Sequence, residues 1–149
     1  MTDVLSPCAG TVRPLSEAPD PVFAAEMVGS GVAIDPEPVA GEALAPIAGT
    51  LVKAHPHAFV VVGEDGTGVL VHLGIDTVKL AGEGFELLVA EKDTVEAGQA
   101  VTRWDPADVA GRDLSPMVLL CVLDTPAGAV SSDRIGAQVA AGDRLFGWP

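Results

Sequence analysis

The hydrophobic residues of this chain fall into short runs that are separated by turn-forming residues. Seventeen glycines and twelve prolines recur along 149 residues, and no long stretch shows the 3.6-residue period of an amphipathic helix. This pattern predicts an all-β fold, a sandwich or barrel of many short antiparallel strands. Two helical turns are expected, at 21–27 after Asp20 and at 105–110, where Asp105 is a capping residue and Pro106 takes the first helical position.

Two internal repeats indicate how these strands are organised. SPCAGTV at 6–12 resembles APIAGTL at 45–51, and VEAGQAVTRW at 95–104 resembles VAAGDRLFGW at 139–148. Interleaved similarity of this kind is typical of a duplicated β unit folded around one pseudo-twofold core. Because no linker separates the repeats, we expect residues 1–149 to form a single domain.

The three histidines of the chain all lie between residues 55 and 77. Two valine-rich runs, 58–62 and 69–73, favour strands; His57 directly precedes the first and His72 lies within the second. The segment GEDGTG between the runs predicts a hairpin. A two-residue loop, at either Glu64-Asp65 or Asp65-Gly66, would place the two imidazoles on one face of the sheet, whereas a loop of odd length would separate them.

Two chemistries and one structural alternative fit this histidine pair. A neutral imidazole at pH 7 is a nucleophile, so His72 could carry a phosphoryl group while His57 and the backbone N–H groups near Gly74 donate to its oxygens. The alternative is a zinc-dependent hydrolase with His55, His57 and His72 as ligands. Pro56 interrupts the strand there, and no general base lies beside the set. A histidine pair with no chemical role is the third interpretation.

Charge and hydropathy narrow the class of protein. The formal net charge of −13 disfavours nucleic acid and favours a basic partner. The longest apolar run, 117–123, is far shorter than the roughly 18 residues that span a membrane, and the N-terminus lacks a signal-peptide pattern. We therefore expect a cytoplasmic protein without direct membrane insertion. Cys121 lies within the apolar run and predicts a buried side chain.

Three motifs carry a resemblance to a known family. PHAFVVV at 56–62, GVLVHLGIDTV at 68–78 and GEGFELLV at 82–89 resemble the glucose-type enzyme IIA component (EIIA type 1) of the bacterial phosphoenolpyruvate-dependent sugar phosphotransferase system. The resemblance begins at SPCAGTV, covers nearly the whole chain and weakens after Trp104.

The resemblance implies a fold and an activity. The fold would be a compact antiparallel β-sandwich of the duplicated barrel-sandwich hybrid type. His72 would accept a phosphoryl group on Nε2 from a histidine of the carrier protein HPr. It would pass the group to a cysteine on the EIIB domain of a membrane sugar permease of the glucose or N-acetylglucosamine class. The protein would be a phosphotransferase component that requires no cofactor, and regulatory protein targets are further candidate partners.

The resemblance also implies roles for individual residues. His57 would stabilise the phosphoryl group without being phosphorylated, with Gly74 in support. Acidic residues would meet an arginine of HPr, and an apolar ring would surround the histidines. His55 stands where the family has a hydroxyl residue that holds the second histidine. It would do so through a ring nitrogen and would favour adventitious zinc at His57 and His72. The expected partner-binding residues are Asp20, Phe23, Phe59, Leu73 and Asp76.

Overall fold

The computed structural model describes residues 2–149, whose regular structure consists mainly of antiparallel strands. Two short α-helices and two 3₁₀ turns interrupt them. The strands are β1 (Thr2–Leu5), β2 (Gly10–Pro14), β3 (Gly29–Pro36), β4 (Gly41–Leu44), β5 (Gly49–His55), β6 (Ala58–Val62), β7 (Gly68–Leu73), β8 (Phe85–Leu87), β9 (Thr94–Val95), β10 (Ala100–Trp104), β11 (Val118–Leu123), β12 (Gln138–Val139) and β13 (Arg144–Trp148). The helical elements are η1 (Leu15–Glu17), α1 (Pro21–Ala24), η2 (Thr77–Leu80) and α2 (Pro106–Gly111).

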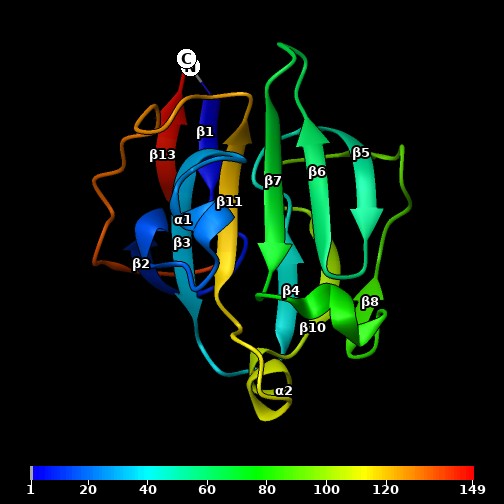
Figure 1. The fold of residues 1–149 in the computed structure, drawn as a ribbon. Coiled ribbons are helices and arrows are strands. Elements are labelled where there is room, and N and C mark those ends of the chain that lie inside the picture. Colours follow the sequence, from blue (N-terminus) through cyan, green and yellow to red (C-terminus); the bar gives the residue numbers. More distant parts are fainter. Residues whose placement is uncertain (1) are drawn as a thin grey trace.

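The strands are arranged as one large curved sheet and two small ones. The large sheet has the order β12-β2-β3-β11-β7-β6-β5-β9, the second has the order β4-β10-β8, and β1 pairs with β13. Figure 1 shows β4 and β10 behind β6 and β7, and both termini meeting at the top of the molecule. The apolar core fills the space between these layers. The predicted all-β sandwich is therefore confirmed.

Hydrogen bonds confirm the duplication that the repeats predicted. In the first half, Gly10 of β2 pairs with Val139 of β12; in the second half, Gly49 of β5 pairs with Val95 of β9 at the matching repeat positions. Backbone bonds outside the ladders repeat in the same way: Ser6 N donates to Asp143 O and Ala45 N to Gln99 O, Leu5 N donates to Pro46 O and Leu44 N to Pro7 O. The two repeats are thus joined around a pseudo-twofold axis.

The two short helices form where capping residues were expected. The Asp20 carboxylate accepts from the backbone N–H groups of Val22 and Phe23, which satisfies two of the free donors at the start of α1. The Asp105 carboxylate accepts in the same way from Ala107 at the start of α2. None of the helices in residues 2–149 combines the length and apolarity that crossing a membrane requires.

The predicted register of the histidine hairpin is wrong. Val62 pairs with Gly68, so the loop between β6 and β7 spans residues 63–67 and has odd length. Its tip is set by Asp65, whose carboxylate accepts from the N–H and hydroxyl of Thr67, while Gly66 takes a positive φ of 86°. This side-chain cap stabilises a longer loop than the two-residue turn that an Asp-Gly pair usually predicts.

Candidate active site

His72 projects from the exposed face of β7, near the end of the strand. Residues of β7 alternate between the core and the outer face, and Val69, Val71 and Leu73 are fully buried. His72 and Leu70 therefore point to the other side of the sheet. His72 is only partly exposed there, because Phe23 of α1 approaches it with a distance of 5.4 Å between ring centroids.

One nitrogen of the His72 ring is held by the backbone. Nδ1 lies 2.6 Å from the carbonyl oxygen of Gly74. Because a carbonyl can only accept, Nδ1 must carry the proton, and the lone pair of the neutral ring is then on Nε2, which points away from Gly74. The geometry thus prepares Nε2 as a nucleophile.

Glycine is required at residue 74 to bring its carbonyl to this place. Gly74 has a φ of +83°, and a Cβ there would lie 2.6 Å from Thr77 Cγ2 and 3.0 Å from the Ser115 oxygen. The buried hydroxyl of Thr77 donates to the Leu73 carbonyl at 2.8 Å, and Gly74 N donates to the Met117 carbonyl. The turn that holds the His72 ring is therefore fixed from both sides.

His57 reaches His72 from a turn and not from a strand. β5 and β6 are joined by Pro56 and His57, and Ala58 is the residue directly opposite His72. Strand alternation would have sent His57 to the core, but outside the ladder its ring is free to fold over the small Ala58 side chain. The centroids of the His57 and His72 rings lie 5.2 Å apart in an edge-to-face arrangement. The predicted proximity of the two rings is thus confirmed, although the loop-parity argument for it was wrong.

Burial keeps both rings uncharged. Desolvation is the main cause that lowers the pKa of His72, and it is opposed by the Gly74 carbonyl and by the charges of Asp20 and Asp76. The pKa of His57 is lowered by desolvation, then by His72 and His55. Both imidazoles are therefore neutral at pH 7. Asp20 and Asp76 lie close enough for their charges to act on His72, and their role in meeting a partner stays a prediction.

Two of the expected rim residues are not on the surface. Phe59 and Leu73 have no exposed area and belong to the core, which contradicts their predicted place in the apolar ring. Phe59 is buried because of the register, which pairs it with Val71 on the face opposite His72. Leu73 is buried because it follows His72 in β7 and therefore points to the other face. Of the three predicted apolar residues, only Phe23 lies beside the histidines.

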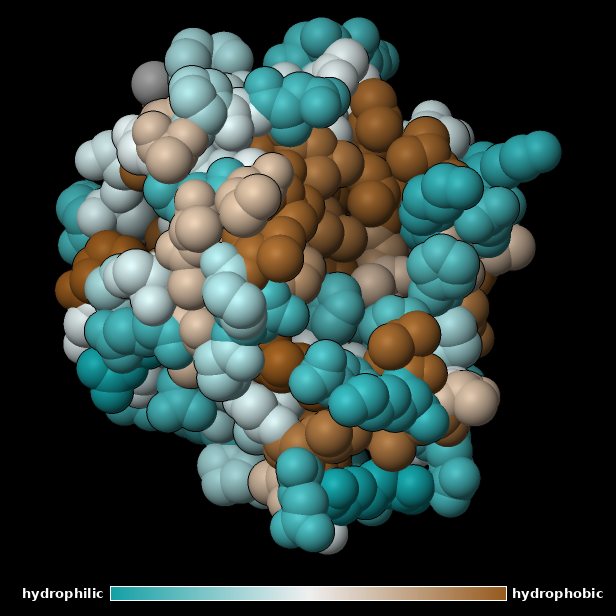
Figure 2. Space-filling view, in the orientation of Figure 1, coloured by the Kyte–Doolittle hydropathy of each residue, from teal (hydrophilic) through white to brown (hydrophobic). Residues whose placement is uncertain are grey.

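The sequence-based prediction missed the apolar residues that share the face of His72. Val60 pairs with Leu70, and Leu70 pairs with Cys121, so all three side chains project from the same face of the sheet. Figure 2 shows a hollowed apolar surface over this part of β6, β7 and β11. Two further apolar side chains, those of Val22 and Val78, are exposed. In the sequence they stand two residues after Asp20 and Asp76, respectively. The same alternation, applied with the correct register, would have selected Val60 and Leu70.

His55 contacts His57 through its ring face. The ring centroids lie 6.0 Å apart and the planes are inclined by only 25°. We expected a ring nitrogen of His55 to hold His57 by a hydrogen bond. Such a bond would lie in the plane of the donor ring, so it does not account for the stacked arrangement of these two rings. Within residues 2–149, no group of three or more His, Cys, Asp or Glu side chains is arranged to hold a metal ion. The zinc-hydrolase alternative therefore has no support.

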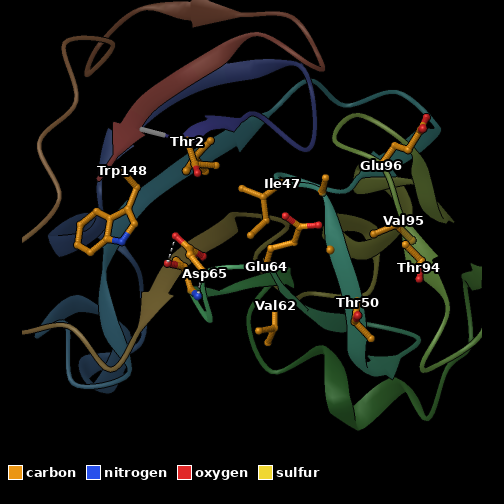
Figure 3. A pocket seen from close by; sticks show the side chains of 15 residues that line it. Thr2, Ile47, Thr50, Val62, Glu64, Asp65, Thr94, Val95, Glu96 and Trp148 are labelled. Atoms are coloured by element: carbon orange, nitrogen blue, oxygen red, sulfur yellow. Dashed lines mark hydrogen bonds between the residues drawn. The ribbon is translucent and has the colours of Figure 1, made fainter.

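A separate cleft of about 720 Å³ lies at the other end of β7. It is lined by the β6–β7 loop with Glu64, by Ile47, and by Thr2 and Trp148 of the terminal strands (Figure 3). None of the expected site residues borders it. The histidine pair therefore forms its own shallow site on the curved sheet.

Comparisons with known proteins show the family of this chain. The profile of the family described as phosphoenolpyruvate-dependent sugar phosphotransferase system, EIIA 1, matches residues 2–127. The glucose-specific EIIA component of Bacillus cereus is 34% identical over 141 residues, which cover 93% of this chain and 84% of that protein. The glucose-specific EIIBCA component of Corynebacterium glutamicum is 37% identical over 141 residues, but the match covers only 20% of its length. The solved structure of glucose permease IIA from Mycoplasma capricolum has a TM-score of 0.80 and 35% identity, over 97% of this chain and 93% of that one.

The duplicated β fold, the paired histidines and these matches define a transferase component of a sugar phosphotransferase system. More narrowly, the chain belongs to the phosphoenolpyruvate-dependent sugar phosphotransferase system EIIA 1 family, in which it is a glucose-type EIIA component.

Proposed function

We propose that this protein accepts a phosphoryl group from phospho-HPr on Nε2 of His72 and passes it to a cysteine of the EIIB domain of a glucose permease. The observation that carries the proposal is the 2.6 Å contact between His72 Nδ1 and the Gly74 carbonyl. It directs the free lone pair to Nε2, the nitrogen that is open to an approaching donor. The glucose class is taken from the names of the relatives. N-acetylglucosamine is the second candidate sugar.

In each step of the transfer one bond to phosphorus forms while another breaks, and neither a metal nor a cofactor is needed. The lone pair of Nε2 attacks the phosphorus in line, a new P–N bond forms, and the P–N bond to the donor histidine breaks. Nδ1 keeps its proton and donates it in a hydrogen bond to the Gly74 carbonyl. This bond stabilises the positive charge that develops on the ring when Nε2 is phosphorylated. In the second step a cysteine thiolate attacks phosphorus, a P–S bond forms, and the electron pair returns to Nε2.

His57 stabilises the phosphoryl group once it has been transferred to His72. Its ring is neutral before transfer, and a dianionic phosphoryl group on the neighbouring His72 would raise the pKa of His57 and favour its N–H as a donor. Phe23, Leu70 and Val60 make an apolar surround that reduces access of water to the P–N bond. The carboxylates of Asp20 and Asp76 lie at the site and suit an arginine of a basic partner.

Incubation with phosphoenolpyruvate, enzyme I and HPr tests this function. We expect an acid-labile, base-stable phosphoryl adduct on the wild-type protein and none on His72→Gln. His57→Gln should still accept the group but should fail to deliver it to EIIB, since only the second histidine's donor is lost. Phosphorylation of His72→Gln at the wild-type rate would refute the proposal.

A further inference from the structure

The strand register places a third imidazole in the site. His55 ends β5 and pairs with Ala58, which in turn pairs with His72. Directly paired residues share a face of the sheet, so His55 and His72 flank Ala58 on the same side. Backbone geometry therefore fixes where His55 projects.

The ring of His57 contacts both of its neighbours above the small Ala58 side chain. Its centroid lies 5.2 Å from that of His72 and 6.0 Å from that of His55. The contact with His72 is edge-to-face, whereas the contact with His55 is nearly parallel at 25°. His55 is thus stacked on the His57 ring while that ring keeps its edge-to-face contact with His72.

Charged groups act unequally on the three rings. After desolvation, the charges of His72 and His55 lower the pKa of His57. The nearby carboxylates of Asp20 and Asp76 act on His72 instead. The Glu91 carboxylate accepts a hydrogen bond of 3.1 Å from the backbone N–H of Ala54, which precedes His55 in β5. A proton on His55 therefore disfavours a proton on His57 through like-charge repulsion.

We propose that His55 is a positioning residue, which holds the His57 ring toward His72 by stacking and, when protonated, keeps His57 neutral until His72 is phosphorylated. The role in phosphoryl delivery rests on the proposed function. It differs from that of a hydroxyl in the same place, which could hold one ring nitrogen but has neither an aromatic face nor an ionisable ring. In this protein, delivery to EIIB then depends on a side chain that touches neither the donor nor the phosphoryl group.

Two variants separate the stacking from the charge. His55→Phe keeps an aromatic face against His57 but cannot be protonated, and His55→Thr removes both the face and the charge. The exposed position of His55 at the end of β5 makes both changes compatible with the fold, which backbone amide spectra would verify. Because the chain has only three histidines, each imidazole can be assigned in nitrogen-15 NMR spectra.

The first measurement is an NMR titration of the unphosphorylated protein from about pH 5 to 8, the range over which imidazoles exchange protons. We expect the pKa of His57 to rise in both variants, and the mobility of its ring to increase only in His55→Thr. If His57 titrates and moves as in the wild type in both variants, the proposal is overturned.

The second measurement is the pH profile of phosphoryl delivery from phospho-His72 to EIIB. His55→Phe should shift the profile to higher pH while keeping the maximal rate, and His55→Thr should shift it and lower the maximum several-fold. Identical profiles for all three proteins would overturn the role in delivery. The titration needs no donor protein, so the two proposals can fail separately. If the His57 pKa shifts in the variants but the wild-type protein accepts no phosphoryl group from HPr, the proposed function is refuted and the coupling of His55 to His57 stands.

Discussion

The chemistry of this protein depends on a few contacts of single residues. The carbonyl of Gly74 selects the tautomer of His72, and burial keeps the ring neutral at a site where a charged imidazole could not attack phosphorus. His57 is placed by a turn, and a small residue beneath it, Ala58, leaves room for its ring. No metal ion has to be invoked for these effects.

The lowered pKa values of His57 and His72 predict how stability responds to pH. Both groups titrate near pH 6.5 in the unfolded chain and lower in the folded protein. As pH falls through this window, the unfolded state binds protons that the folded state does not, so the free energy of unfolding should decrease. Urea denaturation at several pH values between about 5 and 7.5 measures this.

The histidine contribution can be separated from that of the many carboxylates by comparison with a His57→Gln/His72→Gln double variant. As pH falls below about 6.5, we expect the free energy of unfolding to decrease more for the wild type than for this variant. A difference that is constant over this range would contradict the assigned directions.

At the scale of elements, the joint between β7 and η2 is the part that shapes the site. Asp76 and Gly74 both take positive φ values, of 59° and 83°, and Thr77 ties the first turn of η2 back to Leu73. This reversal brings the Gly74 carbonyl to His72. The helix α1 contributes in a similar way, since its Asp20 cap fixes the turn that presents Phe23.

Substitution of Gly74 should damage both stability and phosphoryl acceptance. Gly74→Ala places a methyl group against Thr77 and Ser115 in a left-handed backbone, and we expect a loss of about 1–3 kcal/mol. Phosphorylation of His72 should slow because the carbonyl that holds Nδ1 must move. Thermal or urea unfolding and the phosphoryl-acceptance assay provide the measurements.

Gly66→Ala is the matched control for this change. Gly66 has nearly the same φ, +86°, but open space around its Cβ position. We expect only the conformational cost of about 1 kcal/mol and normal acceptance by His72. Equal effects of the two substitutions would mean that crowding at Gly74 is unimportant.

The apolar surround of the histidines can be tested at α1. Val22 is 46% exposed and precedes Phe23, whereas Val39 is 60% exposed in the loop between β3 and β4, beside Trp104 and Pro106. Val22→Ser should slow phosphoryl transfer several-fold by removing apolar docking area, and Val39→Ser should not. Transfer rates at subsaturating HPr measure this, and equal rates for the two variants would argue against docking at α1.

At the scale of the whole molecule, duplication produces the curved sheet, and charge controls its encounters. The two repeats exchange equivalent backbone bonds, so β11 and β7 lie in the middle of the sheet with partners on both sides. The histidine site therefore lies on the central strands of the large sheet, which are hydrogen-bonded on both sides. Around it, the net charge of −13 creates a long-range field that attracts basic proteins.

This charge predicts a strong effect of salt on phosphoryl acceptance. Raising ionic strength from about 0.01 to 0.5 M shortens the Debye length severalfold, and we expect the second-order rate with HPr to fall by roughly tenfold or more. Stopped or quenched-flow transfer at subsaturating HPr measures it. A rate that is independent of salt would show that steering by charge is absent.

The sequence by itself determined the local elements and the identity of the reactive side chains. Valine-rich runs and glycine-proline breaks predicted the strands, Asp20 and Asp105 predicted the caps, and the repeats predicted the pseudo-twofold core. These features depend on neighbouring residues or on similarity within the chain, and both can be recognised in the linear sequence. The motifs around His57 and His72 likewise indicated the family.

Only the tertiary structure decided which side chains meet on each face of the sheet. A loop of five residues in place of the predicted two turned Phe59 to the core and brought Val60 beside His72, whereas alternation within β7 alone sends Leu73 to the core and Leu70 to the face of His72. The physical reason is that side chains alternate with period two, so a small difference in loop geometry exchanges the two faces completely. His57 escaped this exchange because it lies in a turn, where its position is set by packing against its neighbours.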